Sequence, residues 1–148
     1  MPVSGLEMTK KWFTPSEATK MLPLVKMIVA DIVELVEILQ DQFKRLEQPS
    51  EWEPQSGGSD LLEDIEKGKD KLLHFVEELQ RLGIELKDPE KGLIDFPCLF
   101  EGREIYLCWK HGEDSIEHWH EIYAGFAGRQ PLEKIFPYFE NNSPIVSN

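Results

Sequence analysis

The feature that most constrains this chain is a long heptad pattern of apolar residues near its N-terminus. From Met21 to Leu46 apolar side chains recur at alternating steps of four and three residues, and only Gln42 interrupts the series. A second row beside it widens the apolar arc to about 220° of the helical wheel, whereas an ordinary surface helix shows a stripe of about 100°. This second row consists of Leu22, Val29, Val33, Val36 and Phe43. One partner helix cannot cover so wide an arc, so the pattern predicts a long helix with more than one neighbour.

Local signals mark the ends of this helix and of a second one. Thr14, Pro15 and Glu17 form a capping box with proline in the first turn, which predicts a helix over 14–47. A second heptad stripe ends just before a glycine and predicts a helix over 60–82. The short separation of the two helices in sequence predicts an antiparallel pair.

The segment between the two helices contains helix breakers and small polar residues. We therefore expect a mobile loop over 48–59. In the second helix Gly68 falls on the heptad stripe, where a large side chain is expected. Glycine costs about 1 kcal/mol of helix propensity but permits close approach of a neighbour. We interpret Gly68 as a packing glycine.

After Gly83 the apolar pattern changes to the alternation of β-strands. Two β-prone runs flank a glycine-containing tip at 101–103, which predicts a hairpin within a small antiparallel sheet of three or four strands over 84–109. Cys98 and Cys108 lie in its two arms. A tip of two residues would point them to opposite faces, whereas a tip of three would place them diagonally on one face. We expect two unpaired, buried thiols.

Titratable side chains are most concentrated in residues 111–121, which hold three of the four histidines and four carboxylates. We predict a short helix over 114–124, in which Glu117 and His120 share one face and Glu113 lies one turn earlier. Helix bundles use Glu-x-x-His spacing to present a carboxylate and an imidazole to a metal, and the same pair suits proton transfer. Two interpretations stay open: a divalent-metal site of these three residues, and a solvated acidic face.

A loop with two glycines and a single arginine follows at 125–132. It could present backbone N–H groups and Arg129 to an anion. Alternatively, the guanidinium forms a structural ion pair that holds the loop against the sheet, with Asp95, Glu113 or Glu117 as partner. We favour the ion pair, because an arginine amid so many carboxylates has partners close by.

Charge and hydropathy bound the possible partners. The 148 residues carry a formal net charge of -12, which opposes binding to nucleic acid or to an anionic membrane surface. Apolar runs such as Met27 to Ala30 are no longer than about five residues, and the N-terminus has no signal-peptide pattern. We therefore expect a cytoplasmic protein whose ligands, if any, are cations, metals or neutral molecules.

The combination of motifs resembles a bacterial family catalogued as domain of unknown function 2203, over about residues 12–132. The resemblance places several of the residues discussed above on the family's pattern and favours a site of Asp95, Glu113, His120 and Arg129 over a cluster of histidines. Tails of 1–11 and 133–148 fall outside it. The residues on the family's pattern are Asp95, Trp109, Gly112, Glu113, His120, Gly125, Gly128 and Arg129.

These observations predict an α+β fold: an antiparallel pair of long helices, a small antiparallel sheet and a short C-terminal helix. The chain carries no recognised catalytic signature, so the first function hypothesis is a non-catalytic binding or assembly protein that self-associates through the first helix. The alternative is a metal-dependent or acid–base enzyme. Its site would lie around Asp95, Glu113, Glu117, His120 and Arg129. Trp109 is a candidate wall of such a site. The sequence specifies no cofactor beyond a possible divalent metal, and no small-molecule ligand.

Overall fold

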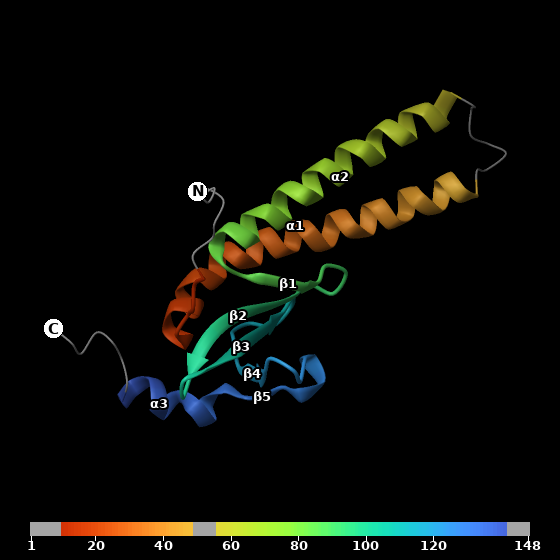
Figure 1. Ribbon diagram of the computed structural model, residues 1–148. Coiled ribbons are helices and arrows are strands. Elements are labelled where there is room, and N and C mark those ends of the chain that lie inside the picture. The colour runs from red at the N-terminus through yellow and green to blue at the C-terminus, as the bar shows by residue number, and fades with distance from the viewer. Residues whose placement is uncertain (1–9, 49–55, 142–148) are drawn as a thin grey trace, which may run out of the picture.

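Two long antiparallel helices cover one face of a five-stranded antiparallel sheet (Figure 1). The computed structural model describes residues 10–48 and 56–141. The sheet has the strand order β1-β2-β3-β4-β5, so every strand pairs with its neighbour in sequence. This confirms the predicted α+β class, with one strand more than expected. In the described residues no helix is both long enough and apolar enough to cross a membrane.

The first helix, α1, spans Pro15–Glu47 and begins as its capping box predicts. The Thr14 side chain accepts the backbone N–H of Glu17, and the Glu17 carboxylate accepts the N–H of Thr14. The second helix, α2, spans Ser56–Leu82 and therefore begins four residues earlier than expected. Most of the predicted loop, residues 49–55, lies outside the described part of the chain.

The half of the helical hairpin nearest the 49–55 connection projects beyond the sheet (Figure 1). A small apolar cluster of Leu39, Leu61 and Ile65 holds the two helices together there. Gly68 lies at the crossing: a Cβ atom at this position would be 2.9 Å from Leu39 Cδ2. This close approach confirms that Gly68 is a packing glycine.

The central hairpin pairs β2 (Leu93–Phe100) with β3 (Arg103–Lys110) through a two-residue tip. Glu101 and Gly102 both adopt positive φ, at 53° and 80°, as a two-residue turn that follows the twist of its strands requires. With this register the two thiols lie on opposite faces of the sheet, and both are free and buried. This resolves the alternatives left open by the sequence.

One face of the sheet packs under α1 and forms the main core. Ile94, Phe96 and Cys98 of β2 contact this core, together with their register partners on β3. The first strand, β1 (Glu85–Asp88), extends the sheet along the other edge of β2. The opposite face of the sheet carries the polar side chains described below.

The predicted helix over 114–124 is wrong. Residues His118–Glu121 instead form strand β4, which pairs with β3 so that His118 faces Cys108 and Trp119 faces Leu107. The turn after β3, closed by the Glu113 N–H on the Lys110 carbonyl, returns the chain to the free edge of β3. Pairing along that edge satisfies the backbone and buries Trp119 in the core, which outweighs local helix propensity.

The last described elements extend past residue 132, where the predicted domain ended and a tail was expected. A two-residue strand, β5 (Gln130–Pro131), pairs with β4, and the 3-10 turns η2 (Phe126–Gly128) and η3 (Leu132–Ile135) flank it. The short C-terminal helix is α3 (Phe136–Asn141). It packs against the core: the Tyr138 ring lies 5.0 Å from that of Phe100, and Phe139 stacks on the same ring.

Candidate functional site

Polar side chains from three neighbouring strands meet on the sheet face opposite the helices. Asp95 of β2, Cys108 of β3 and His118 of β4 are register partners in one row across the sheet. His120, two residues further along β4, points to the same face and pairs with Tyr106. Because side chains alternate along a strand, each of these residues is backed by an apolar neighbour in the core.

His120 and Asp95 form a buried ion pair at the centre of this face. His120 Nε2 lies 3.0 Å from Asp95 Oδ1, and each residue is only 2% exposed. The second ring nitrogen, Nδ1, lies 2.7 Å from the Glu121 carbonyl, which can only accept, so Nδ1 is the donor. The candidate ligand atoms of Asp95, Cys108 and His120 all lie within 4.8 Å of one another.

The surroundings of His120 favour the imidazolium form. Burial alone would lower the pKa of His120, but its bonds to Asp95, Cys108 and the Glu121 carbonyl outweigh this effect and raise the pKa to about 10. Both ring nitrogens then donate, one to a carboxylate and one to a carbonyl.

A second set of side chains, Glu85, Lys87 and Tyr106, borders this pair. The edge of the Tyr106 ring packs on His120 with the ring centroids 5.5 Å apart, and its hydroxyl donates to the Glu85 carboxylate at 3.0 Å. Lys87 lies over the Tyr106 ring and binds Glu85 at 2.8 Å. Burial would raise the pKa of Glu85, but the bonds from Lys87 and Tyr106 lower it. These contacts shield the cluster from solvent.

Arg129 and Glu113 form a bidentate ion pair beside the cluster. The two guanidinium nitrogens lie 2.8 and 2.7 Å from the two carboxylate oxygens. Glu113 also accepts the Lys110 backbone N–H, and Arg129 reaches the Cys108 carbonyl at 3.4 Å. Burial would raise the pKa of Glu113, but its bonds from Arg129 and Lys110 lower it. The favoured structural ion pair is thus confirmed, with Glu113 as the partner.

The matched family covers all of this polar face. The family described as "Uncharacterized conserved protein (DUF2203)" matches residues 11–132. The chain belongs to the DUF2203 family. Neither the search of curated proteins nor that of solved structures found a match to this DUF2203 member. The family therefore identifies relatives without assigning a reaction, and the site must be interpreted from its own geometry.

The DUF2203 fold brings together only part of the predicted site. Asp95 and His120 meet directly, while Glu113 and Arg129 pair with each other alongside. Trp109 lies on the opposite face, in the core, and its indole nitrogen donates to the Glu113 carbonyl.

The proposed metal ligands Glu113, Glu117 and His120 do not form a cluster among the described residues. Glu117 accepts a hydrogen bond from Ser115 instead. Three residues apart in an extended chain, two side chains point to opposite sides, whereas in a helix they share a face. The three-residue spacing that would have placed Glu117 and His120 on one face of a helix therefore separates them in the extended chain.

Cys108, Tyr106 and Glu85 are the residues of this DUF2203 face that sequence reasoning missed. Their signal was present in the alternation of polar and apolar residues along β1, β3 and β4. Tyr106 and Cys108 flank Leu107 in the same way that His118 and His120 flank Trp119. Such a two-residue period predicts a common face only once the segments are known to be adjacent strands.

Proposed function

We propose that this protein is a non-catalytic binding or assembly protein that forms a homodimer through its helical hairpin. The observation that carries the proposal is an exposed apolar flank of α1. Leu24, Met27 and Ile38 are 47%, 68% and 46% exposed, although large apolar side chains in a long helix are normally covered. At 100° per residue these three positions fall within about 60° of one another.

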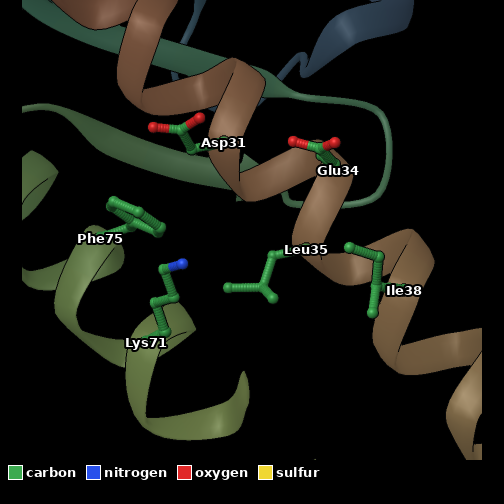
Figure 2. A pocket seen from close by; sticks show the side chains of 6 residues that line it. All are labelled: Asp31, Glu34, Leu35, Ile38, Lys71 and Phe75. Carbon is green, nitrogen blue, oxygen red and sulfur yellow. The ribbon is translucent and has the colours of Figure 1, made fainter. Parts of the chain in front are cut away.

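This flank continues into a groove between α1 and α2. The groove has a volume of about 350 Å³, and Leu35, Ile38 and Phe75 supply its apolar lining. Figure 2 shows Asp31 and Glu34 on the α1 side of the groove and Lys71 on the α2 side. An apolar strip bordered by charges is the composition expected of an interface that forms and dissociates.

The charges of the groove favour a second copy of the chain as its occupant. Asp31, Glu34 and Lys71 form no ion pair within the described residues, so their charges are available to a partner. A two-fold interface places the same surface on both sides. The acidic side of one copy can then meet Lys71 of the other, twice per dimer. A partner of this chain's own charge pattern is therefore complementary, whereas a purely acidic partner would be repelled.

The enzyme alternative receives less support from the geometry. His120 is 2% exposed and both its ring nitrogens are engaged, so a substrate proton has no access to it. Glu113 is held by Arg129. The net charge of -12 supports our expectation that nucleic acid is not a partner. That the protein acts in the cytoplasm stays a prediction from the sequence.

Sedimentation equilibrium of the full chain tests the proposal. We expect a dimer for the wild type, a monomer for Ile38→Glu, and a dimer for the control Leu73→Glu. Leu73 is a matched control because it is 56% exposed on the same hairpin but does not line the groove. A wild-type monomer at about 100 µM, or dimerisation that survives Ile38→Glu, would overturn the proposal.

A further inference from the structure

The buried side chains of Asp95, Cys108 and His120 offer one oxygen, one sulfur and one nitrogen atom that all lie within 4.8 Å of one another. They come from the adjacent strands β2, β3 and β4 (Figure 1). We propose that they form a structural metal site for one borderline divalent d-block ion of the Zn²⁺ type. This ligand set differs from the one suggested by the sequence and does not depend on the proposed self-association.

The spacing of the three donors suits such an ion. Bonds of about 2.0–2.3 Å in a tetrahedral arrangement place neighbouring ligand atoms roughly 3.3–3.8 Å apart. The three donor atoms here lie within 4.8 Å of one another, with Nε2 and Oδ1 at 3.0 Å. Shifts of about 1 Å or less therefore bring all three into bonding distance. One thiolate and one imidazole favour a borderline ion over Mg²⁺ or Ca²⁺, which prefer oxygen.

The orientation of His120 matches that of a metal-ligating histidine. Its Nδ1 donates to the Glu121 carbonyl at 2.7 Å, which directs Nε2 toward the other two donors. Ligating histidines are usually oriented in this way by a carbonyl or carboxylate on the far nitrogen. The backbones of three paired strands carry the ligands, so little conformational freedom remains to be lost on binding.

His118 is the candidate fourth ligand. It pairs in register with Cys108 and points to the same face of the sheet. Its Nδ1 atom is buried and has no hydrogen-bond partner among the described residues. A rotation of the His118 side chain toward Cys108 would complete the four-coordinate set typical of structural zinc sites.

The ligand set matches the charge of a divalent ion. A divalent ion would displace one proton from His120 Nε2 and one from Cys108 Sγ, and both protons would leave to solvent. The charges of the ion, the carboxylate, the thiolate and the neutral imidazole sum to zero. The bound site therefore buries no net charge, which removes a main obstacle to a metal in this environment.

Titration of the chelator-treated full chain with Co²⁺ tests the proposal. Bound thiolate produces a charge-transfer absorption in the near ultraviolet that carboxylates on the acidic surface cannot produce. We expect one equivalent of Co²⁺ to saturate this band and Zn²⁺ to abolish it. Cys98→Ala is the matched variant, because Cys98 is equally buried but lies on the opposite face.

The chain has only two cysteines, so each outcome is decisive. A band that persists in Cys98→Ala must come from Cys108, even if Cys108→Ala fails to fold. A wild-type protein without the band, or a band lost in folded Cys98→Ala, would overturn the proposal. Loss of the band in Asp95→Asn, with unchanged circular dichroism, would add the carboxylate to the ligand set, whereas an unchanged Co²⁺ affinity in this variant would remove it and overturn the three-ligand site. Sedimentation of the same samples reports on dimerisation separately.

Discussion

The imidazole of His120 on β4 reaches across β3 to the carboxylate of Asp95 on β2, with Nε2 3.0 Å from Oδ1. The contact joins residues 25 positions apart in sequence and ties three strands together. Removing either partner would leave a buried charge alone, which is the costly way to break such a pair. The pair therefore matters for stability whether or not a metal binds.

Titration of His120 predicts a loss of stability at alkaline pH. Its pKa rises from 6.5 to about 10 on folding. Protonated His120 therefore adds its full contribution to the free energy of unfolding below about pH 6.5, and this contribution is lost as the pH rises through 10. Urea unfolding of the chelator-treated protein should show a decrease on the order of 2–4 kcal/mol over this window.

His120→Gln provides the control for the alkaline transition. Glutamine can still donate to Asp95 but does not titrate. The difference in unfolding free energy between wild type and variant should therefore shrink between pH 6.5 and 10. A difference that stays constant with pH would show that His120 does not titrate as we expect.

The bidentate ion pair of Arg129 with Glu113 should stabilise the fold more than the exposed bidentate pair of Arg103 with Glu121 does. Arg129→Lys keeps the charge but cannot bind both oxygens of Glu113, and we expect it to cost about 1–2 kcal/mol of unfolding free energy. Arg103→Lys is the matched control, since Arg103 also binds Glu121 through two nitrogens but is far more exposed. It should cost less than about 1 kcal/mol. Equal losses in denaturant unfolding would contradict the structural role of Arg129.

The close contact at Gly68 predicts that a large side chain there separates the helices. Gly68→Leu should destabilise the protein by about 1–3 kcal/mol, because Leu39 occupies the space. Lys67→Leu, one residue earlier and exposed, should change stability by less than about 0.5 kcal/mol. Thermal unfolding of both variants measures the difference. A Gly68→Leu protein as stable as Lys67→Leu would show that the helices can separate there at little cost.

Charge reversal tests the proposed dimer independently of its apolar contacts. Lys71→Glu should weaken dimerisation about three- to tenfold, since it opposes like charges across the two-fold axis. Adding Glu34→Lys restores opposite charges and should recover the affinity. Sedimentation at several salt concentrations measures the effect, which added salt should reduce. Failure of the double variant to recover would count against a Glu34–Lys71 contact between copies.

Local signals in the sequence were sufficient for the helical half of the molecule. The capping box at Thr14 and the heptad rows involve residues within one or two turns of each other, so they act in any tertiary context. Gly68 could be interpreted as a packing glycine because its position on the heptad stripe implied a facing helix. The central hairpin was predictable from its glycine-containing tip, but the tip length, and with it the faces of the two cysteines, was not.

Local sequence signals did not predict the arrangement of the polar site. Residues 114–124 have helix signals at short range, yet the free edge of β3 offered backbone partners that no local pattern records. Because this segment is a strand and not a helix, Glu117 points away from His120, and His120 points toward Asp95.

The sequence by itself determined the fold class, the ends of α1, the α-helical hairpin and the family, because periodicity, caps and motifs are short-range properties. Only the tertiary structure decided that Asp95, Cys108 and His120 converge and that Glu113 belongs to Arg129. Those contacts depend on which strands lie side by side and in which register, and a shift of one residue would send every one of these side chains to the other face.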